Sequence, residues 1–353
     1  MQLGVNLVYD GAGRLAAAAE ELGYAVALAP EGYRSDAPSV LGYVAARTER
    51  IGLVAGVMQI PGRPPGMAAL TAATLDALSG GRFRLGLGVS NPDVSDGWYG
   101  VPFDQPLART REYVAVVRSA LRGEPVGHPG AHYPLPGSTA GDLADHGAPL
   151  HLFTEPLRPE LPIYLAAAGP RNLQLAGEVA DGWIGVFTPP DAVKAAVDEL
   201  TIGRTRAGRP WAGFEVMPCL PAAIADDAEA AAGLLRPQYV YLLGIGDARR
   251  NLHCRLMRRM GFAAAVDAIR GALARGDRAA AAAAVPFELI DATALVGTPS
   301  RVAARMAEYA AAGVTTLGIM VSAAATDLDG RLAIVHGAAE ALDRSVTFLS
   351  GRS

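Results

Sequence analysis

The sequence predicts an α/β protein folded as a (β/α)8 barrel, and three observations support this prediction. Short apolar runs alternate with segments of helical spacing, there are eight such strand–helix repeats, and the longer irregular stretches follow strands. A doubly wound open sheet is the alternative. The near-continuous apolar character of the strands favours the barrel, because parallel strands are covered on both faces.

The elements follow one another in a regular order. The first strand, "QLGVNLV", precedes a segment with helical periodicity, and the same pair of patterns recurs along the chain. The expected strands cover residues 2–8, 25–30, 51–60, 82–89, 161–169, 182–187, 213–225 and 315–322. The expected helices cover 12–24, 37–47, 64–81, 104–123, 170–180, 189–208, a segment from Asp226, and 329–343.

Capping residues mark several of these boundaries. Asp104 is the expected N-cap of the fourth helix, and Gly123 is its expected end. Pro170 stands in the first turn of the fifth helix, where its fixed φ is favourable.

Two stretches interrupt the alternation. Residues 124–160 are rich in Pro, Gly and His and predict an excursion or lid, and residues 246–300 predict a second, irregular and basic excursion. A chain of 353 residues can bury one large core, so we expect a single domain over 1–353 with these two insertions.

Composition narrows the class of protein. A hydrophobic content of 51% indicates a globular chain, and a net charge of −4 gives no reason to expect binding to nucleic acid or a membrane surface. No apolar run reaches the length of a membrane span, and "MQLGVNLVYDGAGR" has no signal-peptide pattern. Two cysteines, Cys219 and Cys254, do not form a disulfide framework, so we expect a cytoplasmic protein.

In a barrel of this kind the chemistry lies where the strands end. The fifth strand ends in Ala168, Gly169, Pro170, Arg171 and Asn172, which lead directly into a helix. Backbone N–H groups and the positive end of the helix dipole would face the mouth there, and Arg171 adds a charge. The segment predicts an anion site, with a plain tight turn as the alternative.

The fourth strand ends in "GVSNPD" and raises the same possibility. Ser90 and the N–H groups beyond Gly88 could hold a phosphate, although Ser-Asn-Pro is also ordinary turn chemistry. Two such strand ends one step apart around the barrel suggest a single phosphorylated ligand.

Other motifs favour structural interpretations. His253 and Cys254 are adjacent and have no second pair at ligand spacing, so no metal site is expected. The basic run 249–259 predicts a solvated helix face, or a surface that attracts an acidic ligand tail. "RLGLGVS" contains GxG but lacks the third glycine and acidic partner of a dinucleotide fingerprint.

Longer segments carry a family resemblance. "TAATLDALSGGRFRLGLGVS", "GWYGVPFDQPLARTREYV" and "LPIYLAAAGPRNLQLAGEVADGW" resemble the luciferase-like oxidoreductases that use a flavin or coenzyme F420. "LLRPQYVYLLGIG", "LHCRLMRRMGF" and "AAAAVPFELIDATALVGTP" resemble the F420-dependent branch. The similarity extends from residue 1 to about 345.

The resemblance implies a deazaflavin or flavin bound across the barrel mouth. It implies a non-prolyl cis peptide at Gly56–Val57, or at the neighbouring Val57–Met58, forming a bulge behind the cofactor ring. It also implies that the cofactor phosphate lies between Ser90 and the turn 169–172, with Gly88 and Asn91 nearby. A homodimer formed through the helices that flank the first three strands is a further implication.

The chain departs from that pattern at two positions. Sugar-phosphate dehydrogenases of the F420 branch carry an Asp-His pair where this chain has Glu31 and Gly32, and a Glu where it has Asn91. Without those groups alcohol oxidation is disfavoured, and reduction of an activated C=C or C=N bond by F420H2 becomes the leading hypothesis. Glu31, Tyr33 and Asp36 are then the nearest candidate proton donors, with cap or rim positions as their structural alternative.

Two other functions remain open at this point. An FMN-dependent two-component monooxygenase is the alternative enzyme, although Gly32 stands where bacterial luciferases carry an active-site His. A non-catalytic cofactor-binding barrel is the alternative outside enzymes. In every case the expected partner is a small molecule.

Overall fold

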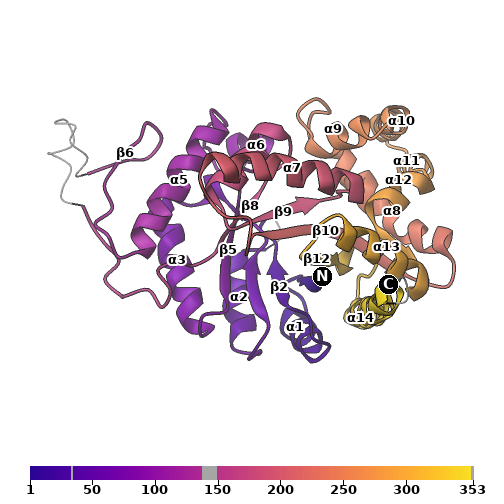
Figure 1. Ribbon diagram of the computed structural model, residues 1–353. Helices are drawn as coiled ribbons and strands as arrows, with labels where there is room; N and C mark the ends of the chain where they lie inside the picture. The colour runs from indigo at the N-terminus through magenta and orange to yellow at the C-terminus, as the bar shows by residue number, and fades with distance from the viewer. Residues whose placement is uncertain (33–34, 137–148, 351–353) are drawn as a thin grey trace.

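A computed structural model describes residues 1–32, 35–136 and 149–350 of the chain, and it shows a closed barrel of parallel strands surrounded by helices (Figure 1). The barrel strands are β1 (Gln2–Asn6), β2 (Val26–Ala29), β3 (Gly52–Ala55), β5 (Phe83–Gly88), β8 (Ile163–Ala166), β9 (Gly182–Val186), β10 (Glu215–Ile224) and β12 (Thr316–Met320). Each strand pairs in parallel with its neighbour. The ring closes because β12 pairs with β1 and β10 pairs with both β9 and β12. The predicted (β/α)8 fold is confirmed, and each predicted strand overlaps an observed one.

The third strand is interrupted. A cis peptide bond joins Gly56 to Val57, after which β4 (Met58–Gln59) resumes the pairing with β5. This is the first of the two bonds that the family resemblance indicated.

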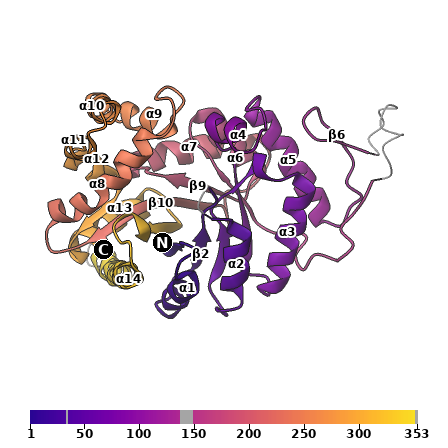
Figure 2. The same cartoon turned by 180° about the vertical axis from the view of Figure 1, so that it is seen from behind.

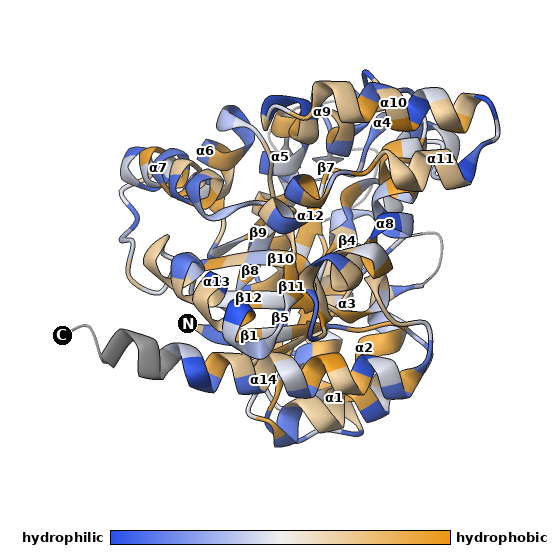
Figure 3. Ribbon diagram, turned by 90° about the vertical axis from the view of Figure 1, so that its right-hand side faces the viewer, coloured by the Kyte–Doolittle hydropathy of each residue, from blue (hydrophilic) through white to orange (hydrophobic). Residues whose placement is uncertain are grey.

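Helices cover the outside of the strands. They are α1 (Ala12–Glu21), α2 (Ala37–Ala45), α3 (Pro65–Leu78), α5 (Pro106–Leu121), α6 (Pro170–Val179), α7 (Pro190–Arg206), α8 (Ala228–Gly244), α13 (Pro299–Ala311) and α14 (Leu328–Ser350). Figure 3 shows hydrophobic colour concentrated on the central strands and hydrophilic colour on the outer faces of the helices. No helix in the described ranges is long and apolar enough to cross a membrane.

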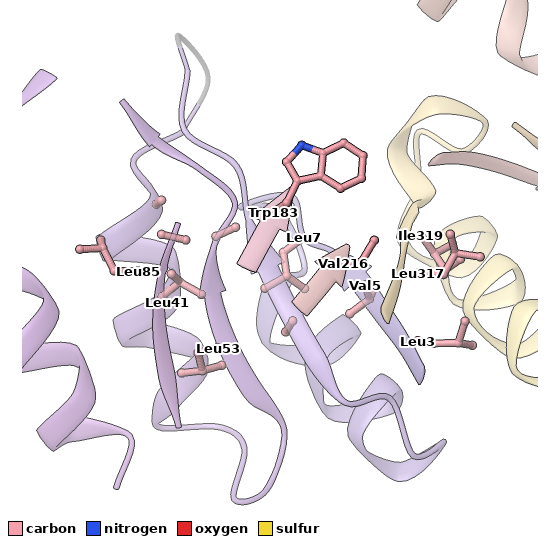
Figure 4. Close-up of a cluster of buried hydrophobic side chains, with 14 of the residues drawn as sticks. Leu3, Val5, Leu7, Leu41, Leu53, Leu85, Trp183, Val216, Leu317 and Ile319 are labelled. Atoms are coloured by element: carbon pink, nitrogen blue, oxygen red, sulfur yellow. The ribbon is translucent and has the colours of Figure 1, made fainter. Parts of the chain in front are cut away.

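Alternation along the strands builds two apolar layers. Leu3 and Val5 of β1, Leu53 of β3 and Leu85 of β5 belong to the larger core between strands and helices (Figure 4). Alternate residues form a smaller cluster that is made almost entirely of barrel-strand side chains: Val26, Leu28, Val54, Tyr164, Ile184, Met217 and Cys219. The barrel is therefore filled by side chains below its mouth.

The stretch 246–300 is not irregular, so this prediction was wrong. It forms α9 (Leu252–Arg259), α10 (Ala263–Ala274), α11 (Arg278–Ala283), α12 (Phe287–Thr293) and β11 (Leu295–Gly297). These elements and α8 enclose a second core around Tyr239. Each helix is short and is separated from the next by a glycine or proline turn, so no long periodic pattern marks the segment in the sequence.

Two local predictions also need correction. Asp104 is not the cap of α5, because Gln105 occupies that position and Asp104 instead pairs with Arg109. A short helix, α4 (Pro92–Gly97), follows β5 where only a turn was expected.

The first excursion carries a small hairpin, β6 (His128–Pro129) and β7 (Pro134–Leu135). Glu112 of α5 fixes it by accepting hydrogen bonds from the N–H groups of residues 131, 132 and 133. Figures 1 and 2 show the hairpin projecting beyond α5, away from the barrel strands.

Candidate active site

The carboxyl ends of β5 and β8 lie side by side at the barrel mouth. The two strands pair in parallel and end with Gly88 opposite Ala166, so the segments that follow them begin side by side. The two segments predicted to bind an anion are therefore neighbours in space.

The β8–α6 turn leaves a helix N-terminus open. Gly169 has φ of +91°, a conformation that favours glycine, and its position before α6 is not capped by a side chain. Pro170 has no N–H to satisfy, so the N–H groups of Arg171 and Asn172 are available in the first turn. Arg171 is exposed, as is Ala168. These features suit an anion.

The β5–α4 turn is built differently. Ser90 has φ of +66°, and its hydroxyl donates to Oε1 of Gln59 at 2.6 Å. The side-chain oxygen of Asn91 accepts from the N–H of Val94 at 3.1 Å, so Asn91 is the N-cap of α4. Since a serine hydroxyl carries one hydrogen, Ser90 can donate to a ligand only by releasing Gln59.

The cis bond and Gly88 approach each other closely. A Cβ atom at Gly88 would lie 2.7 Å from Cγ2 of Val57, and one at Gly56 would lie 3.1 Å from Cβ of Leu28. Val57 thus faces the barrel interior, whereas Met58 is buried in the outer core. The side chain of Val57 therefore packs directly against the buried backbone of Gly88.

Glu31 lies in a buried ion pair. Both of its carboxylate oxygens are 2.7 Å from Nη1 of Arg63, and Oε1 also accepts from the N–H of Gln59 at 3.0 Å. The Glu31 side chain is only 5% exposed. Gln59 therefore connects Glu31 to Ser90.

Of the other two candidate proton donors, Asp36 lies within the described residues. Asp36 caps α2 by accepting from the N–H and hydroxyl of Ser39, and it pairs with Arg63 at 2.5 Å. Burial acts to raise the pKa of Asp36, but the Ser39 hydrogen bonds and the Arg63 charge outweigh it, so the pKa is below its ordinary value. Tyr33 lies outside the described residues.

Sequence reasoning missed three polar residues at this end of the barrel. Gln59 ends β4 and Arg63 follows it, in the segment "MQIPGR". Asn6 ends β1, and its buried Oδ1 accepts no hydrogen bond of normal geometry from the described residues, although the weakly donating thiol of Cys219 lies beside it. A polar side chain ending an apolar strand was the available signal for Asn6.

His253 is part of the packing of the second core. Its ring meets Phe187, which follows β9, edge to face with centroids 5.4 Å apart. Burial lowers the pKa of His253 to about 4, and its buried Nδ1 has no partner in the described part of the chain. Cys254, the next residue of α9, is also buried. In the described ranges no three His, Cys, Asp or Glu side chains gather as a metal site.

Comparison with known proteins places this geometry in a family. The model of the luciferase-like monooxygenases matches residues 2–316. A Mycobacterium tuberculosis protein, whose name assigns it provisionally to the coenzyme F420-dependent oxidoreductases, is 39% identical over 92% of this chain and 96% of its own. A 5,10-methylenetetrahydromethanopterin reductase from Methanolobus tindarius is 31% identical over 80% of this chain and 81% of its own.

A solved structure agrees in fold. The coenzyme F420-dependent tetrahydromethanopterin reductase from Methanopyrus kandleri superimposes with a TM-score of 0.81 over 96% of this chain and 97% of that one, at 24% identity. That structure shares the barrel described above. This chain belongs to the luciferase-like monooxygenase family and is an enzyme of that family.

Proposed function

We propose that this enzyme uses reduced coenzyme F420 to transfer a hydride to an activated C=C or C=N bond of a small molecule. The observation that carries the proposal is the juxtaposition of the open α6 N-terminus, Ser90 and the cis peptide, where Val57 packs against Gly88. The name of the Mycobacterium tuberculosis relative supports the choice of cofactor.

These residues fit a phosphorylated, planar cofactor. The phosphate would be held by the N–H groups of Arg171 and Asn172, the guanidinium of Arg171 and the Ser90 hydroxyl, while the ring would lie against Val57 and Gly88. Reduced F420 supplies the hydride when bound, and the protein orients it.

The acidic residues of the mouth support reduction rather than alcohol oxidation. Oxidation needs a free base to take the hydroxyl proton. Both oxygens of Glu31 already accept from Arg63, and Asp36 is occupied by Ser39 and Arg63. Their assigned role is therefore to hold the loops after β2 and β3 together, and the proton that completes reduction comes from water or a weak acid.

Cofactor titration tests the proposal. F420 binding would be followed by its fluorescence in the wild type, in Ser90→Ala and in Arg171→Ala. Each variant should weaken binding by at least tenfold, roughly 1.4 kcal/mol. Arg206→Ala, at the C-terminal end of α7, is the control and should leave binding unchanged.

Activity and cofactor choice need separate measurements. Anaerobic oxidation of F420H2 by 2-cyclohexen-1-one or a cyclic imine would report hydride transfer directly. Tight FMN binding without F420 affinity, or flavin-dependent oxygen consumption, would instead establish the monooxygenase alternative. Binding of F420 with no turnover of any acceptor would favour a non-catalytic barrel.

We also propose a homodimer formed through α2 and α3. Tyr43 on α2 is 50% exposed, and Met67 and Leu70 on α3 are 52% and 47% exposed. Size-exclusion chromatography with light scattering should show twice the chain mass, and Leu70→Glu should halve it. A monomeric wild type would overturn this proposal.

A further inference from the structure

The loop between α8 and α9 reaches the turn that follows β5. The approach is close enough that a Cβ atom at Gly246 would lie 2.0 Å from Oδ2 of Asp93, in the first turn of α4. Arg270 fixes the loop by donating to the carbonyls of Leu243 and Gly246 at 2.7 and 2.8 Å. The C-terminal excursion therefore extends to within three residues of Ser90.

This loop and α9 carry a concentrated positive charge. Residues 247–259 contain five arginines and one aspartate, in a chain whose net charge is −4. Arg258 is paired with Asp267, but Arg249, Arg250, Arg255 and Arg259 are exposed, and their guanidinium groups donate no hydrogen bond to any residue in the described ranges.

The aspartates nearby offset only part of this charge. Asp247 accepts a hydrogen bond from the N–H of Arg249 at 2.8 Å. This bond, together with the charges of Arg249 and Arg250, holds the pKa of Asp247 below its usual value. Asp93 lies against the loop at Gly246.

Three segments are consequently adjacent on this side of the barrel. These are the β5–α4 turn, the β8–α6 turn with the exposed Arg171, and the α8–α9 loop with Arg249 and Arg250. Figure 2 shows α4, α6 and α9 along the same edge of the molecule. Because residues are at most about 3.6 Å apart along a chain, Arg249 and Arg250 lie within roughly 15 Å of the Gly246–Asp93 contact.

We propose that Arg249 and Arg250, supported by Arg255 and Arg259, bind a flexible polycarboxylate that leaves the phosphate site. This inference rests on the proposed function, and the ligand class is the oligoglutamate tail of F420. Guanidinium groups suit it because they pair with carboxylates in a fork geometry without being buried. A tail held by exposed pairs can vary in length, whereas the phosphate and ring need one fixed position.

The test compares F420 bearing five to seven glutamates with F420 lacking glutamates. Dissociation constants would be measured by fluorescence at low and high NaCl, for the wild type, Arg249→Gln/Arg250→Gln, and the control Arg275→Gln/Arg278→Gln. The control pair removes the same charge from the exposed turn between α10 and α11, and in Figure 2 α9 lies between that turn and α4.

We expect the wild type to bind the glutamylated form more tightly, with the difference shrinking at high salt. An exposed ion pair strengthens binding by a factor of roughly two, so the test variant should lose about fourfold for the glutamylated form and nothing for the other. Equal losses for both forms, or equal losses in the control variant, would overturn the tail site and leave the cofactor assignment standing. Failure of the wild type to bind either form would overturn the proposed function itself.

Discussion

The buried imidazole of His253 makes the stability of the protein depend on pH. The folded state keeps this ring neutral because burial lowers its pKa to about 4, whereas an unfolded chain titrates near 6.5. Between these values the unfolded state binds more protons than the folded state. Stability contributed by His253 is therefore complete above pH 6.5 and is lost as the pH falls towards 4.

The size of the effect follows from the shift. One pKa unit corresponds to about 1.4 kcal/mol, so lowering the pH from 7.5 to 5 should cost about 2 kcal/mol of unfolding free energy through this residue. That is a large fraction of the 5–15 kcal/mol typical of a domain. Urea denaturation followed by circular dichroism at both pH values measures it.

Substitution isolates the contribution of His253. His253→Leu should remove about 2 kcal/mol of the difference between pH 7.5 and 5, and His336→Leu, at an exposed position on α14, should leave it unchanged. If the wild type and His253→Leu lose the same stability on acidification, the ring is not held neutral by its surroundings and the reasoning is wrong.

Three further substitutions probe the mouth and the barrel wall. Arg63→Met should destabilise the fold by about 3–5 kcal/mol, because it leaves the buried Glu31 carboxylate without its partner. Gly86→Ala should cost about 3 kcal/mol or more, because the added Cβ would lie 1.9 Å from the carbonyl oxygen of Ala55. Asn91→Ala should cost about 1 kcal/mol by removing the cap of α4. Chemical denaturation measures all three.

Controls separate these explanations from general damage. Arg63→Met combined with Glu31→Gln should recover much of the loss, since the unpaired charge is then removed. Gly66→Ala, where no atom lies within 4 Å of the new Cβ, should be tolerated. Asn91→Asp should retain the cap, and a destabilisation equal to that of Asn91→Ala would show that the side-chain acceptor is irrelevant.

The barrel was predictable because its strands are apolar over their whole length. Segments such as 82–89 and 182–187 are buried on both sides in the structure, so the pattern that marks them reflects their packing. The turn at Gly169 was equally predictable from the sequence. Glycine suits the positive φ before α6, and the proline that follows it suits the first position of the helix.

Contacts between residues that are far apart in the sequence could not be predicted in this way. Glu31 and Arg63 are 32 residues apart in the sequence and meet only because β2 and β3 are adjacent, so the ion pair between them could not be predicted from the sequence. The short helix after Asn91 had a local signal, an Asn followed by proline, but six residues are too few to show periodicity. The short helices of residues 246–300 were missed for the same reason.

The length of β10 determines where a segment of this enzyme could be exchanged for another. Beyond the barrel, its residues 222–224 pair with β11, and the N–H of Ala225 donates to the carbonyl of Gly297 at 3.1 Å. The excursion that includes α8–α12 thus leaves and rejoins the framework at one hydrogen-bonded junction. Segments of different length and composition could be exchanged at that junction without altering barrel closure. Residues 226–294 could accordingly be replaced as a unit while the pairing of the barrel strands is kept, provided that the new segment covers Phe187 and Val296 as the present one does.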